Sequence, residues 1–136
     1  MLRGICKKEN FLDLFENFIL YDHSGGHTAK ILARNHQYLG VNEAMKAYAA
    51  RKLNDGKLGV FWHTQGSGKS YSMVFLPQKV RRKFQGSPTF VILTDREELN
   101  SQISDTFENC GLLGKTKASQ FIATSGDDLV QKLKGN

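Results

Sequence analysis

The sequence predicts an α/β fold in which parallel strands alternate with helices. Two short apolar runs, KLGVFWH (57–63) and TFVILT (89–94), have the composition of strands buried on both faces. A segment with helical spacing of apolar residues follows each run, and a glycine-rich loop joins the first run to its helix. This alternation is typical of parallel strands that are connected by right-handed crossovers.

The composition is that of one globular domain. The chain has 136 residues, of which 40% are hydrophobic and 24% charged, so it has enough apolar material for a core. No apolar run approaches the roughly 18 to 20 residues of a membrane span, and the N-terminus lacks the features of a signal peptide. We therefore expect a cytoplasmic protein that does not contact a membrane. Cys6 and Cys110 are too far apart to indicate a zinc site or a disulfide framework.

The net charge of +6 leaves two interpretations open. A basic domain favours polyanions such as nucleic acids or nucleotides, but a basic solvated surface without a partner would have the same composition. The clearest basic run, KVRRKF (79–84), is most often an exposed helix face and indicates DNA contact only weakly.

Two helices are expected before the first strand. Residues 9–20 place five apolar side chains at helical spacing, and YDHSGGHTAK (21–30) then interrupts the pattern. A second helix is predicted over residues 36–53 and should end at Asn54, Asp55 and Gly56. The apolar residues of the first helix are Phe11, Leu12, Phe15, Phe18 and Ile19.

The second half of the chain continues the alternation. A helix should start near residue 69, and Pro77 should kink or end its first segment. Residues 95–110 form the next expected helix, because Leu99, Ile103 and Phe107 are four apart. QFIAT (120–124) is a possible third strand, and a last helix should follow with Ser125 as its N-cap and Asp128 three residues on.

The loop HTQGSGKS (63–70) predicts a phosphate-binding site. Gly66 and Gly68 allow backbone N–H groups to point at a ligand, and the start of the following helix adds free N–H groups and the positive end of its dipole. Lys69 can reach the terminal phosphates, and the Ser70 hydroxyl suits the coordination of Mg²⁺. The G-x-x-x-x-G-K-[ST] pattern fits except at its first glycine, which is His63 here. A glycine-rich turn that binds nothing is the alternative, but burying a lysine there without an anion would be costly.

The base of the nucleotide is a separate question. No N-K-x-D string for guanine follows the loop, whereas Arg34 and Gln37 in ARNHQ precede it at an expected helix start. A glutamine amide can donate to and accept from the adenine edge at once, and an arginine can stack or pair nearby. These residues predict adenine recognition, although polar residues are also ordinary at a helix terminus.

Three stretches carry a resemblance to a known family. KILARNHQYLGVNEAMKA (30–47), GVFWHTQGSGKSYSMVFL (59–76) and TFVILTDREELNSQI (89–103) resemble the start of the motor region in the R subunit of type I restriction–modification enzymes, which are helicase-like proteins of superfamily 2. WHTQGSGKS is especially characteristic, and a residue other than glycine at its first position is normal there. The resemblance covers the chain from about residue 10 onward.

The resemblance implies a P-loop NTPase fold with an incomplete RecA-like domain. Residues 1–33 would be the helical linker that leaves a nuclease domain, and residues 34–136 would be the N-terminal part of the first RecA-like domain. It also implies the ATP and Mg²⁺ site, in which Lys69 is catalytic and Ser70 holds the metal. The implied cofactor-binding residues are Arg34, Gln37, Thr64, Gln65, Gly66, Ser67, Gly68, Lys69, Ser70 and Tyr71.

The motif TDREELNSQ (94–102) implies a contact with the DNA backbone. Thr94, Arg96 and Gln102, together with Asp95, occupy the matching positions, and helix packing is the alternative role for these residues. By family, the whole subunit hydrolyses ATP, translocates double-stranded DNA and cleaves it when translocation stalls. Its partners there are a specificity subunit and a methylation subunit.

The chain is expected to be catalytically incomplete. The Asp-Glu motif that holds Mg²⁺ and polarises water, the arginine finger and the nuclease motif of the family have no copy here. We therefore expect a fragment or a truncated reading frame. Three other functions remain open: a fragment of another superfamily 2 helicase or translocase, a complete small P-loop enzyme such as a kinase, and a non-catalytic interaction module.

Overall fold

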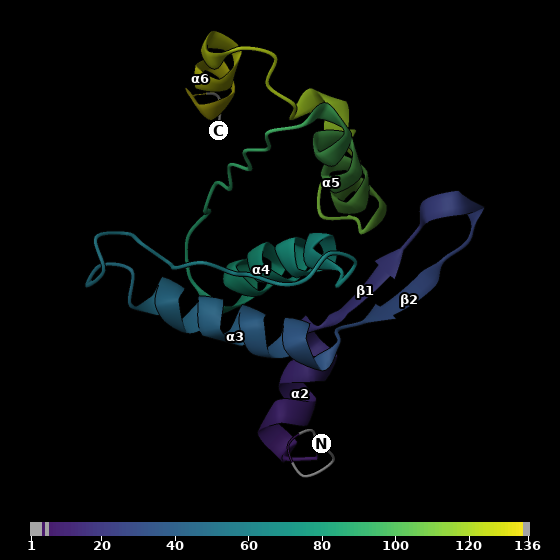
Figure 1. Cartoon of the computed structure of the whole chain (residues 1–136), viewed down its shortest axis with the longest axis vertical. Coiled ribbons are helices and arrows are strands. Elements are labelled where there is room, and N and C mark those ends of the chain that lie inside the picture. Colours follow the sequence, from purple (N-terminus) through teal and green to yellow (C-terminus); the bar gives the residue numbers. More distant parts are fainter. Residues whose placement is uncertain (1–3, 5, 135–136) are drawn as a thin grey trace.

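The computed structural model describes Gly4 and residues 6–134 (Figure 1). Among these residues no helix is long and apolar enough to cross a membrane. Helices dominate, and one small sheet lies near the N-terminus. In chain order the elements are α2 (Lys8–Asn17), β1 (Ile19–Asp22), the 3₁₀ turn η1 (Ser24–Gly26), β2 (Ala29–Leu32), α3 (Asn35–Ala49), α4 (Lys69–Lys83), α5 (Glu97–Asn109), the 3₁₀ turn η2 (Ala118–Gln120) and α6 (Gly126–Lys134).

The small sheet is an antiparallel hairpin that corrects the prediction for the N-terminal segment. The helix expected over residues 9–20 ends at Asn17, and Ile19–Asp22 pairs with Ala29–Leu32. The apolar spacing that suggested one helix runs across this boundary, but ILYD and AKIL are short apolar segments around a glycine pair, which is a hairpin signal. Gly25 and Gly26 take the positive φ angles, 66° and 77°, that the turn requires. The hairpin lies beside the helices, because β1 contacts α2 and α5 and the His23 amide donates to the Asn109 carbonyl at 3.1 Å (Figure 1).

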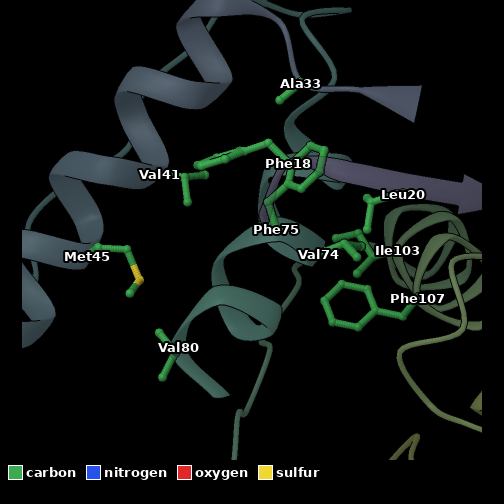
Figure 2. Packing of buried hydrophobic residues seen from close by; sticks show 10 residues of the cluster. All are labelled: Phe18, Leu20, Ala33, Val41, Met45, Val74, Phe75, Val80, Ile103 and Phe107. Atoms are coloured by element: carbon green, nitrogen blue, oxygen red, sulfur yellow. The ribbon is translucent and has the colours of Figure 1, made fainter. Parts of the chain in front are cut away.

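The core surrounds α4, which lies beside α3 and also contacts α2 and α5. Phe18, just before β1, is fully buried and its ring lies next to that of Phe75 on α4 (Figure 2), with the ring centroids 5.5 Å apart. Val74 of α4 lies with the two α5 residues Ile103 and Phe107. The buried apolar cluster as a whole comprises Phe18, Leu20, Ala33, Val41, Met45, Val74, Phe75, Val80, Ile103 and Phe107.

The two predicted buried strands are wrong. Residues 57–64 and 87–94 have no strand structure, and their apolar side chains are largely exposed, with Val60 at 94% and Leu93 at 96%. A strand needs a neighbour for its backbone N–H and C=O groups, and within the described residues the only sheet is the β1–β2 pair. The possible strand at 120–124 is absent as well, because η2 and the turn after it occupy its start.

The predicted helices are confirmed in position. Helix α3 begins at Asn35, one residue before the expected start, but it ends at Ala49 and not at residue 53 as predicted; turns follow through Gly56. Helix α4 begins at Lys69 as expected, but it continues through the buried Pro77 to Lys83, so the prediction of an end there is wrong. One missing N–H removes a single backbone hydrogen bond, and packing against the core offsets that loss. At α6 the Ser125 cap is present, because the Asp128 amide donates to Ser125 Oγ at 3.2 Å.

Candidate nucleotide-binding site

The predicted phosphate loop, residues 64–70, wraps the N-terminus of α4. Gly66 and Gly68 have φ angles of 75° and 82°, which other residues rarely adopt. The Ser67 amide donates to the Thr64 carbonyl at 3.3 Å. Among the described residues, no acceptor pairs with the backbone amides of Gly66, Gly68, Lys69 and Ser70. These four N–H groups are therefore available to an anion, as are the N-terminal amides of helices in general.

Lys69 lies against the loop itself. Its ammonium group donates to the carbonyl oxygens of His63 and Thr64, each at 2.9 Å, while the side chain remains exposed. Both acceptors are neutral, so a phosphate oxygen would be a stronger partner for the same donors. The next residue, Ser70, is half-buried in the first turn of α4, and Thr64 and Gln65 are exposed. The loop therefore carries an exposed cation as well as unpaired amides.

Gln37 braces the loop from α3. The Arg34 amide donates to Gln37 Oε1 at 2.8 Å, and Gln37 Nε2 donates to the Gly68 carbonyl at 2.8 Å. A β-carbon on residue 68 would lie 2.8 Å from Gln37 Nε2, which explains why a glycine stands there. Each polar atom of this buried amide could form one more hydrogen bond. The sequence prediction placed Gln37 at a ligand and did not foresee this second task.

His36 is a second brace that the sequence analysis missed. Its Nε2 donates to the Ser67 carbonyl at 2.9 Å, and its ring meets the His63 ring edge-on with the centroids 4.8 Å apart. Both rings line a small hollow of about 240 Å³ together with Trp62, Thr64 and Ser67. Burial, followed by the charges of His36 and Lys69, lowers the pKa of His63. The one sequence feature that could have pointed to His36 is its position next to Gln37.

A larger cleft lies between the loop and the hairpin. It has a volume of about 400 Å³, within the range of small-molecule sites. The structure thus brings together Arg34, Gln37 and Tyr71, which the sequence had assigned to a nucleotide. It adds three of the four residues of β2, which the sequence had not assigned to a nucleotide. The lining residues are Lys30, Ile31, Leu32, Arg34, Gln37, Gly66, Gly68 and Tyr71.

Tyr71 is fixed by a buried carboxylate. Its hydroxyl donates to Asp22 Oδ2 at 2.6 Å, and the Ser24 amide donates to Asp22 Oδ1 at 2.8 Å. The hydrogen bond from Tyr71, and after it that from Ser24, lowers the pKa of Asp22. The same bond to Asp22, aided by burial, raises the pKa of Tyr71 to about 12. Tyr71 thus stays a neutral donor and connects α4 to the hairpin.

The residues predicted to contact DNA lie outside the cleft. Arg96 directly precedes α5, and its exposed guanidinium lies 3.8 Å from the Asp95 carboxylate. Thr94 is half-buried, and Gln102 is exposed in the second turn of α5. None of the three lines the cleft. They therefore form a group separate from the nucleotide-binding candidates.

Comparison with known proteins shows a match to an ATPase family and similarity to restriction enzyme subunits. Residues 36–136 match the SWI2/SNF2 ATPase family. The HindI type I restriction enzyme endonuclease subunit of Haemophilus influenzae is 42% identical over 113 residues, which are 80% of this chain and 11% of that protein. The putative MjaIXP type I restriction enzyme endonuclease subunit of Methanocaldococcus jannaschii is 31% identical over 141 residues, 99% of this chain and 13% of that protein. The chain thus spans about a tenth of the length of these relatives. No solved structure matches it.

Proposed function

Because the chain belongs to the SWI2/SNF2 ATPase family and resembles type I restriction enzyme endonuclease subunits over most of its length, we propose that it forms the ATP-binding start of such a subunit's motor. In this role residues 64–70 bind the phosphates of ATP. Residues 34–136 would be the N-terminal part of a RecA-like domain, whose parallel sheet needs partner strands that the described residues do not provide. Residues 1–33 would connect this domain to what precedes the motor.

The observation that carries the proposal is the state of the loop. Four amides of the loop lack acceptors among the described residues, and the Lys69 ammonium donates to neutral carbonyls of the same loop. A triphosphate would accept from these amides and draw Lys69 off His63 and Thr64. Lys69 then holds the terminal phosphates, and the remaining loop residues Thr64, Gln65, Gly66, Ser67 and Gly68 form the cradle.

The metal and the base have their own candidate residues. The Ser70 hydroxyl stands at the start of α4 and would bind Mg²⁺, which shields the charge of the phosphates when bound. Arg34 and Gln37 lie on the cleft beside Tyr71 and would contact adenine. Because Gln37 also holds the Gly68 carbonyl, base binding and loop geometry depend on the same side chain.

We place the DNA contact at Thr94, Arg96 and Gln102. The exposed Arg96 guanidinium is paired only with a neighbouring surface carboxylate at 3.8 Å, a weak interaction that a phosphate can displace. In the whole enzyme the motor would translocate double-stranded DNA and support cleavage, with methylation and specificity subunits as partners. Hydrolysis would need carboxylates to hold Mg²⁺ and polarise water, and none of the residues that line the cleft carries one.

Titration of the chain with a fluorescent ATP analogue and Mg²⁺ tests the nucleotide site. We expect weak, Mg²⁺-dependent binding that Lys69→Ala reduces by about ten- to a hundredfold, since hydrogen bonds to charged groups contribute about 1.5–3 kcal/mol. Lys115→Ala, in the turn after α5, removes an equal charge away from the loop and should bind as the unaltered chain does. Equal binding by Lys69→Ala would remove the basis of the proposal.

A second titration tests the DNA contact. The chain should bind duplex DNA with an affinity that falls as salt rises, and Arg96→Ala should weaken it uniformly across sequences and lower the salt slope by about one. Lys115→Ala again serves as the control for net charge. An unchanged salt slope in Arg96→Ala would place the DNA contact elsewhere.

A further inference from the structure

The hairpin forms one wall of the cleft, and its backbone has N–H and C=O groups that could bind a ligand. The sheet has only the two strands β1 and β2 among the described residues, so the edge of β2 away from β1 is unpaired. Lys30, Ile31 and Leu32 of this strand line the cleft opposite Gly66 and Gly68. The cleft therefore has β2 on one side and the phosphate loop on the other.

The hydrogen-bond pattern determines which backbone groups face that edge. The Ala33 amide donates to the Phe18 carbonyl at 3.0 Å, and the register continues as Ile19 with Leu32, Leu20 with Ile31 and Tyr21 with Lys30. Hydrogen-bonded and non-hydrogen-bonded pairs alternate along an antiparallel ladder. Since residue 33 is in a hydrogen-bonded pair, residue 31 is as well, and residues 30 and 32 point their N–H and C=O groups outward.

We propose that the β2 edge reads the adenine base, with the Lys30 carbonyl accepting from the exocyclic amine and the Leu32 amide donating to a ring nitrogen. Adenine presents such a donor beside an acceptor, whereas guanine presents O6 as an acceptor where adenine has its amine. Ile31, partly buried against the core, supplies an apolar surface between the two polar groups. This inference rests on the proposed ATP site and adds the β2 edge to Arg34 and Gln37 as a determinant of its base specificity.

The bond between Tyr71 and Asp22 holds this wall in place. Asp22 is buried on β1, opposite Ala29, and it accepts from Tyr71 in the first turn of α4 at 2.6 Å. The strand edge and the amides of the phosphate loop thus belong to one braced unit. Tyr71 is a positioning residue in this arrangement, because its hydroxyl is directed at Asp22.

The test uses proline to remove one outward N–H group. Leu32→Pro deletes the amide at the β2 edge and keeps the ladder to β1, since proline is tolerated where the N–H points away from the partner strand. Tyr21→Pro makes the same change on the opposite edge of the hairpin and is the matched control. Binding of ATP, GTP and tripolyphosphate to each variant would be measured by competition with the fluorescent analogue.

We expect Leu32→Pro to lower the preference for ATP over GTP by about three- to tenfold, the effect of one net hydrogen bond, and to leave tripolyphosphate binding unchanged. Tyr21→Pro should keep the preference. An intact preference in Leu32→Pro overturns the proposal. Absence of tripolyphosphate binding by the unaltered chain would instead refute the phosphate site.

A measurement on the unaltered chain covers the case in which the proline variants do not fold. In ¹⁵N-labelled protein the Leu32 amide resonance should shift on addition of ATP and stay in place on addition of tripolyphosphate, whereas the Gly66 and Gly68 amides should shift with both. A Leu32 amide that does not respond to ATP while the loop amides do would overturn the assignment of the base to β2.

Discussion

The Tyr71 hydroxyl donates a hydrogen bond of 2.6 Å to Asp22 Oδ2 and thereby connects the first turn of α4 to the end of β1. Cys110, just after α5, lies close enough that the charge of Asp22 acts on it. Burial and then this charge raise the pKa of Cys110 to about 11. The Tyr71 phenol, bonded to the same carboxylate, has a pKa of about 12. Helix α4, strand β1 and the residue after α5 therefore meet at the Asp22 carboxylate.

Alkaline pH should weaken the fold through these two groups. Both pKa values lie above the ordinary values of 9.0 for cysteine and 10.0 for tyrosine, so the folded state holds its protons more tightly than the unfolded state. Their contribution to stability is complete below pH 9 and disappears as pH rises through about 11 and 12. Urea midpoints between pH 8 and pH 12 would show this decline.

Variants separate this decline from general alkaline unfolding. Tyr71→Phe combined with Cys110→Ala should lower the midpoint at pH 8 and flatten its pH dependence, because neither proton remains to be lost. Tyr21→Phe, which alters an exposed tyrosine of β1, should retain the full slope. A double variant with an undiminished slope would show that other groups cause the alkaline loss.

The buried Lys79 should be a second determinant of stability. Its ammonium donates to both Asp13 oxygens at 2.5 and 2.7 Å and to Asn42 Oδ1 at 2.6 Å, and it lies 4.6 Å from the centroid of the Phe18 ring. Lys79→Met would leave the Asp13 carboxylate without its cation, at a cost of about 3 kcal/mol in the free energy of unfolding. Urea denaturation measures this loss.

The companion variant tests the cause. Lys79→Met with Asp13→Leu removes both charges and should regain most of the stability, because no buried carboxylate remains unpaired. Partial burial opposes ionisation, but Lys79, Asn17 and Asn42 together lower the pKa of Asp13. The pair should therefore stabilise the chain above pH 3.8 and progressively less as the pH falls below it. A double variant as unstable as the single one would mean that Lys79 acts through packing alone.

Local chemistry explains what the sequence could predict. The conformations of Gly66 and Gly68 and the position of Lys69 depend on residues within a single loop. The loop and its helix therefore lie where the sequence predicted them, and Gln37 lies at the predicted helix start. The hairpin was missed because apolar residues from Phe11 to Ile19 satisfy a helical period across its start. Lys79 stands in a basic run that suggested an exposed face, and only Asp13, 66 residues earlier, explains why it is buried.

The same distinction explains the two missing strands. Val60 and Leu93 lie in apolar runs whose composition is typical of buried strands. Such a composition predicts burial, but a strand also needs a neighbouring strand to pair with. Pairing depends on residues far away along the chain, which local patterns do not reveal. In the same way, the base-facing edge of β2 follows from ladder alternation and from no side-chain motif.

Gly40 and Phe61 provide a test of how the first of these segments is held. The Phe61 ring lies against Gly40 on α3, and a β-carbon at residue 40 would overlap the ring. Gly40→Ala should therefore displace residues 57–63 and reduce stability by about 1–3 kcal/mol, even though alanine favours the helix. In a Phe61→Ala background the same change should instead stabilise by up to about 1 kcal/mol. Thermal unfolding of the unaltered chain, the two single variants and the double variant measures the effect of Gly40→Ala on stability in each background. An effect of the same sign in both backgrounds would show that Phe61 does not rest on Gly40.

Exposed apolar runs should make the chain associate in solution. Trp62 is 78% and Leu93 96% exposed, each within a segment whose backbone has no strand partner among the described residues. Such segments are templates for pairing with another copy. We expect sedimentation velocity to show larger species as concentration rises, and a double variant of Trp62→Ser and Leu93→Ser to reduce them. Leu53→Ser, which alters a leucine that is 87% exposed in the turn after α3, should have little effect because it interrupts no apolar run. A monomer with a sharp thermal transition that is the same at every concentration would contradict this prediction.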